Sequence, residues 1–337
     1  MKVAVVILNY NGAAMLGRFL PLVVKYSPGA DIVVADNAST DDSVALLAAG
    51  FPSVRVVQLD RNYGFADGYN KALTQIDAEY YLLLNSDVEV TEGWLEPLLS
   101  FMENNPNAVA CQPKILAYNN KTHFEYAGAA GGFIDRYGYP YCRGRMFDTV
   151  EEDKGQYDGV CRIFWATGAA IMVRSAAFHG AGGFDGRFFA HMEEVDLCWR
   201  MLARGGEIYA VPQSKVYHVG GATLNKSNPR KTFLNFRNNL LMLYKNLPHC
   251  ELRGVMRTRT VLDYVAAVKF IAIGAWGDFK AVVRARREYK RMRGEYKSVR
   301  EQNLAMAVVP VIKERAAFSL LWQYYMKRKK YFSQLNK

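Results

Sequence analysis

Four short apolar runs in the first ninety residues most constrain how this chain can fold, because segments of helical period separate them. Runs of four to eight β-branched and aliphatic residues are typical of buried parallel strands in βαβ units. The runs are Val3–Leu8, Ile32–Ala35, Val54–Leu59 and Tyr80–Leu84, with helices expected at about 13–26, 41–49, 65–77 and 91–104. This alternation predicts a doubly wound, mostly parallel α/β sheet over residues 1–107. Beyond this region we expect hairpins and loops at 119–160, a buried strand at Arg162–Val173 that is broken at Thr167-Gly168, and a strand at Glu207–Val211.

We expect the polar residues that follow these strands to lie together, because ligands of open parallel sheets bind beyond the carboxyl ends of the strands. Asn9 follows the first strand, Asp36 and Asn37 follow the second, and Asp87 follows the fourth. Carboxylates and amides without a lysine favour a nucleotide and a metal ion held by side chains. An acidic residue in the position of Asp36 commonly binds a nucleotide, and capping of the following helix is the alternative interpretation.

No glycine-rich phosphate loop follows the first strand, where the chain reads Asn9-Tyr10-Asn11-Gly12, and a Walker loop is missing as well. A divalent cation is therefore the natural partner of a bound diphosphate. Asp87 is the only carboxylate of the Asn85-Ser86-Asp87 triplet that follows the fourth strand. We expect Asp87 to hold Mg²⁺ or Mn²⁺ together with substrate phosphates, and a turn with capping side chains is the alternative.

A second group of carboxylates begins a short helix expected at about 194–203. Glu193, Glu194 and Asp196 lie within four positions of each other, and a helix N-terminus favours negative charge. Neighbouring Phe and Trp side chains are expected to raise the pKa of one carboxylate towards the range of a general base. We interpret Asp196 as the i,i+4 partner of Arg200 and one of the two glutamates as the base.

His218 is one of five histidines and precedes Gly220-Gly221 near the end of a predicted strand. A lone histidine in such a place is more often structural than a ligand. The glycines allow the backbone to approach a ligand closely, which favours metal binding. Both roles therefore stay open for His218.

The positive charge of the chain is confined to its last quarter. Residues 251–337 carry 20 Lys and Arg against 7 Asp and Glu, whereas residues 1–250 carry 23 against 25. This distribution argues against nucleic-acid binding across the whole protein. From residue 251 we expect a basic, amphipathic, mostly helical extension, in which Val261–Val283 and the arginines after it resemble an interfacial helix on anionic lipid. Packing on the body or on a second subunit, as in a homodimer, is the alternative.

The cysteines and the apolar segments predict where the protein works. The five cysteines contain no Cys-x-x-Cys pair, which indicates a reducing compartment without structural zinc. The amino terminus begins in a strand rather than in a basic and apolar leader, so secretion is not expected. No run of eighteen apolar residues predicts a membrane span. We therefore expect a cytoplasmic protein.

These motifs together resemble family 2 glycosyltransferases of the GT-A fold, in the rhamnosyltransferase-like subgroup. The matching stretches form an ordered set over about residues 1–245, which comprises Val5–Gly12, Val33–Asp41, Asn62–Ala66 with Asn70, Leu82–Val90, Trp165–Val173, Gly182–Arg200 and His218–Gly221. The resemblance implies a GT-A domain at residues 1–250 and a helical extension at 251–337. Within the domain, residues 1–107 would bind the donor nucleotide and residues 108–250 would bind the acceptor.

The resemblance also implies roles for individual residues. Asp36 would contact the base of a nucleoside diphosphate sugar, Asp87 would hold the metal ion, and His218 would lie near it. Glu194 would be the catalytic base, with Glu193 as the alternative. The other implied positions are Asn9, Tyr10, Asn37, Asn62 and Asn70 at the donor nucleotide, and Trp165, Gly168 and Asp196 at the acceptor.

The activity that the resemblance implies is an inverting, metal-dependent sugar transfer. The acceptor would be a hydroxyl of a glycan or a lipid-linked molecule in the synthesis of cell-surface polysaccharide. Rhamnose is the commonest donor sugar of the subgroup, and UDP-linked hexoses stay open. A lipid-linked acceptor and the basic extension predict peripheral attachment to the inner face of the cell membrane. The alternatives are a sugar nucleotidyltransferase, whose usual glycine-rich loop is missing here, and a nucleotide-sugar-binding protein without catalysis.

Overall fold

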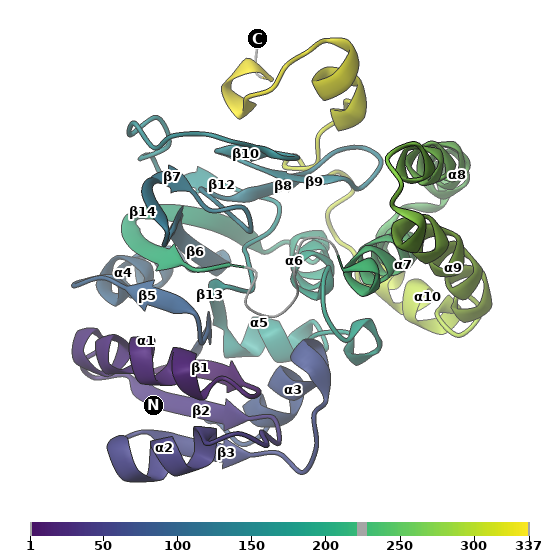
Figure 1. Ribbon diagram of the computed structural model, residues 1–337. Coiled ribbons are helices and arrows are strands. Elements are labelled where there is room, and N and C mark those ends of the chain that lie inside the picture. Colours follow the sequence, from purple (N-terminus) through teal and green to yellow (C-terminus); the bar gives the residue numbers. More distant parts are fainter. Residues whose placement is uncertain (1, 221–227, 336–337) are drawn as a thin grey trace.

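The computed structural model describes residues 2–220 and 228–335, and a mixed β-sheet runs through its centre (Figure 1). The first half of the sheet contains the four predicted strands, which are β1 (Val3–Asn9), β2 (Asp31–Asp36), β3 (Arg55–Gln58) and β4 (Tyr80–Asn85). They pair in parallel in the order β3-β2-β1-β4. The register sets Asn9 beside Asp36 and Leu8 beside Asn85, so the polar strand ends meet at one edge.

Helices cover both faces of this parallel part, because its strands are apolar on both faces. They are α1 (Ala13–Tyr26), α2 (Ser43–Gly50), α3 (Gly64–Leu73) and α4 (Leu95–Asn104), close to the predicted ranges. Val5 and Ile7 of β1 pack in one core with Leu16 of α1, whereas Val6 packs in the other core with Tyr69 of α3. The prediction of a doubly wound α/β fold is confirmed.

Antiparallel strands enter in the second half of the sheet. β13 (Ala170–Arg174) lies antiparallel between β4 and β6 (Ala108–Ala117), and β14 (Glu207–His218) runs parallel to β6. β14 continues past Val211, its predicted end, through an irregularity in the register. Its pairing with β5 (Val88–Val90) sets His218 opposite Val88, next to Asp87. β7 (Asn120–Phe124) and β12 (Cys161–Arg162) complete the sheet.

The strand expected at residues 162–173 is divided by the turn at Thr167-Gly168. Before the turn, Trp165 pairs with Gly132 of a smaller sheet, and after it β13 begins. The turn is closed by a hydrogen bond from the Ala169 N–H to Oγ1 of Thr167 at 3.2 Å. The expected hairpins at 119–160 include this smaller sheet, which consists of β8 (Gly132–Ile134), β9 (Pro140–Cys142), β10 (Arg145–Met146) and β11 (Thr149–Val150).

The helical extension packs on the α/β body and then returns across the smaller sheet. The remaining helices are α5 (Ser175–Gly180), α6 (Glu193–Ala203), α7 (Pro229–Asn246), α8 (His249–Ala272), α9 (Trp276–Met292) and α10 (Lys297–Ala305). α9 and α10 contact α7. Beyond α10 the chain is mostly irregular, and its Ala316 N–H donates to the Ile134 carbonyl at 2.9 Å. The prediction of a mostly helical extension is therefore confirmed only as far as Ala305.

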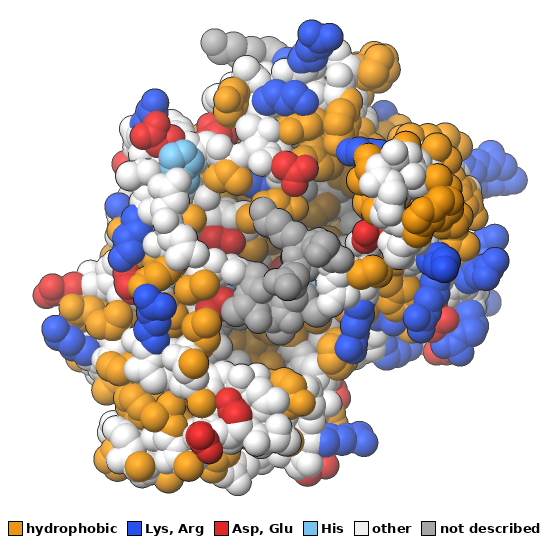
Figure 2. Space-filling view, viewed as in Figure 1, with side chains coloured by type: hydrophobic (Ala, Val, Ile, Leu, Met, Phe, Trp, Pro, Cys, Tyr) orange, Lys and Arg blue, Asp and Glu red, His pale blue; other side chains and the backbone are white. Residues whose placement is uncertain are grey.

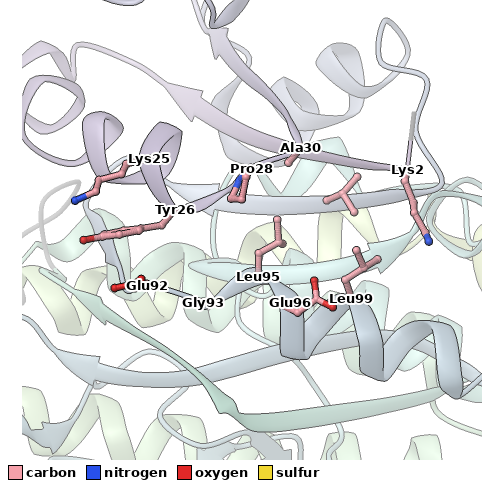
Figure 3. A pocket seen from close by; sticks show the side chains of 12 residues that line it. Lys2, Lys25, Tyr26, Pro28, Ala30, Glu92, Gly93, Leu95, Glu96 and Leu99 are labelled. Atoms are coloured by element: carbon pink, nitrogen blue, oxygen red, sulfur yellow. The ribbon is translucent and has the colours of Figure 1, made fainter.

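One cavity lies at the edge of the sheet opposite to the polar clusters. It has a volume of about 430 Å³, and the side chains that line it include Lys2, Tyr26, Ala30 and Glu96 (Figure 3). Lys2 and Ala30 precede β1 and β2, so the cavity faces the amino ends of the strands, where ligands of this kind of sheet do not bind. In residues 2–220 and 228–335, no helix combines the length and the apolar character needed to cross a bilayer.

Candidate active site

The ends of β1 and β2 form the first polar network of the site. Asn9 is buried and donates from Nδ2 to Oδ1 of Asp36 and to Oγ of Ser39, both at 3.1 Å. The second carboxylate oxygen of Asp36 accepts from the backbone N–H of Ser39 at 2.9 Å. Asp36 is therefore held by the loop after β2. It does not cap α2, where Asp41 accepts from the N–H of Ser43.

A second amide network joins β2 to the start of α3. Asn37 donates from Nδ2 to Oδ1 of Asn62 at 3.1 Å and to the Gly64 carbonyl at 3.0 Å, and its Oδ1 accepts from the Tyr63 N–H at 2.9 Å. Tyr10 is half exposed at the end of β1. The two networks and this tyrosine bring together five of the six residues predicted at the donor nucleotide, which are Asn9, Tyr10, Asp36, Asn37 and Asn62.

Asn70 departs from the predicted donor group. Its side-chain amide donates to the Phe184 carbonyl at 2.8 Å and accepts from the Phe184 N–H at 2.9 Å. The amide is therefore engaged with the backbone of a loop that precedes α6. Asn70 therefore ties that loop to α3, and its role at the donor nucleotide stays a prediction.

Asp87, His218 and Glu125 form a buried cluster beside the first network, with exposed fractions of 7%, 5% and 6%. Nε2 of His218 donates to Oδ1 of Asp87 at 3.1 Å and lies 3.4 Å from the amide nitrogen of Asn85. Nδ1 of His218 faces Oε2 of Glu125 at 3.4 Å, in an ionic contact without the alignment of a hydrogen bond. Glu125 was not singled out in the sequence, because nothing in its Gly- and Tyr-rich surroundings indicates contact with a strand end ninety residues later.

The charges of this cluster shift the pKa values of its members. Burial alone would lower the pKa of His218, yet the carboxylates of Asp87 and Glu125 raise it to about 10. Burial opposes ionisation of Asp87 too, but the hydrogen bond and the charge of His218 hold the pKa of Asp87 below its ordinary value. The cluster is therefore a tight pair of opposite charges with a second carboxylate behind it.

The Asp87–His218 pair would have the donor chemistry of a site for Mg²⁺ or Mn²⁺ once Nε2 of His218 has released the proton that it donates to Asp87. Carboxylate oxygens are the usual protein ligands of both ions, and neutral imidazole is the commonest metal ligand overall. Among the described residues, no group of three or more His, Cys, Asp or Glu side chains is arranged to hold a metal ion. Two protein ligands therefore fit a cation that takes its other ligands from a diphosphate and water.

α6 begins with the two glutamates that the sequence singled out as candidate bases. Glu193 is buried and Glu194 is partly buried, and Oε2 of each carboxylate is enclosed without a hydrogen-bond partner. Burial and the adjacent carboxylate raise the pKa of Glu193 well above its ordinary value. Burial raises the pKa of Glu194 to about 7. An unpaired carboxylate that titrates near neutral pH is suited to accept a proton in a reaction.

The segment before α6 is held in a backbone conformation that non-glycine residues rarely adopt. Its left-handed residues have φ values of 66°, 71° and 72°, and they are Phe189, His191 and Met192. Asn238 of α7 is fully buried and donates from Nδ2 to three carbonyls of residues 188–191, at 2.8 to 3.0 Å. Asn238 therefore stabilises the strained entry to α6. Its position inside a regular helix gave no signal of this contact.

The residues predicted at the acceptor lie in packed surroundings. Trp165 is 4% exposed and donates from Nε1 to the Phe133 carbonyl at 3.0 Å. Gly168 lies close to Phe65, because a Cβ there would be 3.0 Å from the ring and would require that ring to shift slightly. Trp165 and Gly168 thus belong to a wall whose shape is set by close packing.

Asp196 is a structural residue. Its carboxylate is fully buried and accepts from Arg200 at 3.0 Å, from Lys245 at 2.8 Å and from Asn246 at 2.8 Å. Burial opposes its ionisation, but the charges of Lys245 and Arg200 hold the pKa of Asp196 below its ordinary value. The predicted pair with Arg200 is confirmed. The prediction that Asp196 binds the acceptor is wrong, because protein groups occupy both of its oxygens and it has no exposed surface.

Short contacts between loops join these groups into one site. The carbonyl of Phe189 accepts from the first free N–H groups of α3, at 2.8 and 3.2 Å. Gly64, with a φ of +75°, makes this approach possible, because a Cβ there would lie 2.5 Å from the Phe189 ring. The Asn85 N–H donates to the Ala169 carbonyl at 2.9 Å, which joins the end of β4 to the turn at Gly168. Gly221, the last residue of the His218 motif, lies outside the described residues.

The parallel sheet with polar strand ends, followed by a helix that begins with two glutamates, is the arrangement of the GT-A fold. Residues 4–167 match the sequence model of Glycosyl transferase family 2. This match supports a family 2 glycosyltransferase. The chain is 26% identical over 229 residues to an N-acetylglucosaminyl-diphospho-decaprenol L-rhamnosyltransferase of Mycobacterium tuberculosis, with 64% of this chain and 75% of that relative covered.

Two solved structures share the fold. GalNAc-T7 with UDP, GalNAc and Mn²⁺ has a TM-score of 0.56 and 19% identity, over 73% of this chain and 48% of that chain. TarS 1–349 from S. aureus in complex with UDP-GlcNAc has a TM-score of 0.53 and 16% identity, over 91% of this chain and 89% of that chain. The expected GT-A fold is therefore confirmed over most of the chain.

Proposed function

We propose that the protein catalyses an inverting, metal-dependent transfer of a sugar from a nucleoside diphosphate sugar to a hydroxyl group. The observation that carries this proposal is Glu194, a partly buried carboxylate with an unpaired oxygen and a pKa near 7 at the start of α6. Such a group can take a proton from an acceptor hydroxyl at neutral pH. Glu193 is the second candidate, and its deeper burial favours the protonated form.

The donor would bind at the polar ends of β1, β2 and β4. In this proposal Asp36, held by Asn9 and Ser39, accepts hydrogen bonds from the nucleotide. Asp87 and His218 hold the divalent cation, either Mn²⁺ or Mg²⁺. The bound cation supplies positive charge next to the leaving diphosphate, which stabilises the charge that develops there. A structure of the same fold that was determined with UDP and Mn²⁺ supports this reading.

The reaction itself would be a single displacement. Glu194 removes the proton from the acceptor hydroxyl while the oxygen attacks the anomeric carbon from the face opposite to the diphosphate. The new carbon–oxygen bond forms as the bond to the diphosphate breaks, so the anomeric configuration is inverted. Asn238 holds the entry to α6 and thereby the position of Glu194, and the Trp165–Gly168 wall bounds the acceptor.

The acceptor class is proposed from the relatives. The mycobacterial relative is named for a diphospho-decaprenol acceptor, which is a lipid-linked molecule. We propose that this chain likewise acts on a lipid-linked or glycan hydroxyl in the synthesis of cell-surface polysaccharide. Because a lipid-linked acceptor is confined to a membrane, the protein would work as a peripheral protein at its inner face.

The test is a transfer assay with purified Glu194→Gln protein. We expect turnover to be lost while the dissociation constant of the nucleotide sugar stays within about twofold, because the amide keeps the shape but cannot accept the proton. Glu96→Gln, at the exposed first turn of α4, is the matched control and keeps its activity. Near-normal turnover of Glu194→Gln would show that this residue is not the base.

Further measurements separate the proposed transferase from the alternatives. A screen of nucleotide sugars by thermal shift with Mn²⁺ or Mg²⁺ identifies the donor, and NMR of the product gives the anomeric configuration. Pyrophosphate release from a nucleoside triphosphate and a sugar phosphate would indicate a sugar nucleotidyltransferase. Donor binding with neither hydrolysis nor transfer would indicate a binding protein without catalysis.

A further inference from the structure

α8 buries an ion pair on its inner face and leaves large apolar residues exposed on its outer face, unlike an ordinary surface helix. Its inner face consists of Val255, Arg259, Asp263 and Ala267, at intervals of four. Arg259 and Asp263 form an ion pair at 3.1 Å, and Asp263 also accepts from Arg286 of α9 at 2.5 Å. Since both charges of the α8 pair are buried, this network fixes which face of α8 points outward.

The outer face of α8 is an apolar stripe. Val261, Val265 and Val268 are 63%, 61% and 64% exposed, and Tyr264 beside them is 46% exposed. Spacings of three and four residues place them on one side of the helix. Ile273 extends the stripe beyond the helix end at 65% exposure. Figure 2 shows the hydrophobic side chains gathered over α8, with Lys and Arg around them.

A second apolar segment lies beside this stripe near the end of the chain. Trp322, Tyr325 and Met326 are 54%, 49% and 64% exposed, and four basic residues, Lys327–Lys330, follow them directly. Nζ of Lys269, on the outer side of α8, lies 5.5 Å from the Tyr325 ring centroid. The α8 stripe and the 322–330 segment are therefore parts of one surface.

This concentration of apolar side chains is specific to the extension. Of the sixteen large apolar side chains that are exposed in the described residues, thirteen lie beyond residue 260. The exposed residues of α8 include Arg253, Arg257 and Lys269, and its one carboxylate with an exposed side chain, Glu251, is paired with Arg315 at 2.8 Å. An apolar surface with Trp and Tyr and a mostly basic border is typical of attachment to an anionic lipid surface.

We propose that the surface formed by the α8 stripe and residues 322–330 docks on an anionic membrane. Apolar and aromatic side chains enter the lipid interface, and Lys269 with Lys327–Lys330 binds the headgroups. A second copy of the chain would bring the same positive charge to this face, so charge complementarity favours lipid over a homodimer. α8 and the C-terminal segment lie at the end of the molecule opposite to α2 and β3 (Figure 1).

Docking would bring the protein to the membrane that holds the proposed lipid-linked acceptor, but the docking proposal does not depend on the transfer reaction. The test is flotation of the full chain with vesicles of phosphatidylcholine alone or with 30% phosphatidylglycerol. We expect flotation with the anionic vesicles, weakened by 0.5 M NaCl. Val265→Ser with Val268→Ser lowers the partition coefficient about tenfold. Lys327→Gln with Arg328→Gln abolishes the preference for anionic lipid.

The matched control is Val308→Ser with Val311→Ser, which changes two valines of 71% and 74% exposure outside the surface and leaves flotation unchanged. Equal flotation of the wild type with both kinds of vesicle overturns the proposal. Unchanged flotation of the α8 variant does so too. A dimer that sediments without vesicles and that the α8 variant dissociates would assign the surface to a second copy. We expect the surface variants to transfer sugar to a water-soluble acceptor at the wild-type rate. Loss of flotation and loss of transfer are therefore measured independently, and failure of one proposal can be distinguished from failure of the other.

Discussion

Replacement of Glu194 by Gln is expected to stabilise the protein at high pH while it removes the activity. The carboxylate sits at a partly buried helix start, where burial raises its pKa from 4.5 to about 7. Above pH 7 the folded protein therefore carries a charge in a place that disfavours it. Glutamine has nearly the same shape and no charge, so the variant is free of this cost.

The magnitude follows from linkage between protonation and folding. Between pH 4.5 and 7 the folded state binds a proton that the unfolded state has released, so the stability of the wild type falls as the pH rises through this range. One pH unit of pKa difference corresponds to about 1.4 kcal/mol. The advantage of Glu194→Gln is thus close to zero below pH 4.5 and reaches on the order of 3 kcal/mol above pH 7.

The assay is urea denaturation of both proteins at pH 4.5, 6 and 8. Glu96→Gln is the control, because it removes the same charge from the first turn of a helix at an exposed position. We expect the unfolding free energies of Glu194→Gln and wild type to diverge with pH, and those of the control not to. In parallel, kcat of the variant falls by about 10² to 10⁴, and kcat/KM of the wild type decreases below pH 7 as Glu194 becomes protonated. A difference in stability that is the same at every pH would refute the reasoning.

Three further outcomes test other parts of the structure. Asp196→Asn leaves buried Arg200 without a carboxylate partner and Lys245 with Asp185 alone, and is expected to cost about 3 to 5 kcal/mol in urea denaturation; a cost below about 1 kcal/mol would contradict the structural role. Glu125→Gln removes the carboxylate behind the imidazole of the proposed metal site, and Mn²⁺ titration followed by electron paramagnetic resonance is expected to show 10- to 100-fold weaker binding; an unchanged affinity would exclude this role. Gly64→Ala places a methyl group against Phe189 at a left-handed φ and is expected to cost more than about 1 kcal/mol in thermal unfolding. The comparison is Gly254→Ala, in an open helical position, which is expected to stabilise the protein by up to about 1 kcal/mol.

The first half of the fold was predictable because its order is local. β1, β2 and β4 are apolar runs that are buried on both faces, and α1, α3 and α4 each have an apolar side of helical period. β14 was predicted too short, because its continuation to His218 crosses an irregularity that no periodicity marks. The break that the sequence predicts at Thr167-Gly168 within 162–173 is confirmed, because β13 begins directly after this turn.

The candidate site shows the same division. The carboxylates at Asp87 and Glu193-Glu194 were recognisable from the sequence, because an aspartate soon after a buried strand and two adjacent glutamates at a helix start both stand out from their apolar neighbours. Glu125 and Asn238 were not, since each is defined by a contact with a segment far away in the sequence. Asn70 was assigned by its position in a motif, and only its two hydrogen bonds to Phe184 identify it as a loop anchor.

The sequence by itself determined the alternating fold, the sheet edge at which polar strand ends meet, and the concentration of positive charge after residue 250. Only the tertiary structure decided which carboxylates are free and which are paired, because pairing depends on residues brought together by packing. Asp196 and Glu194 stand two positions apart on α6, yet one is neutralised by Lys245 and Arg200 and the other has an unpaired oxygen. The tertiary structure also decided which face of α8 is exposed, because the buried network of Arg259, Asp263 and Arg286 leaves the valines of this helix on the outer side.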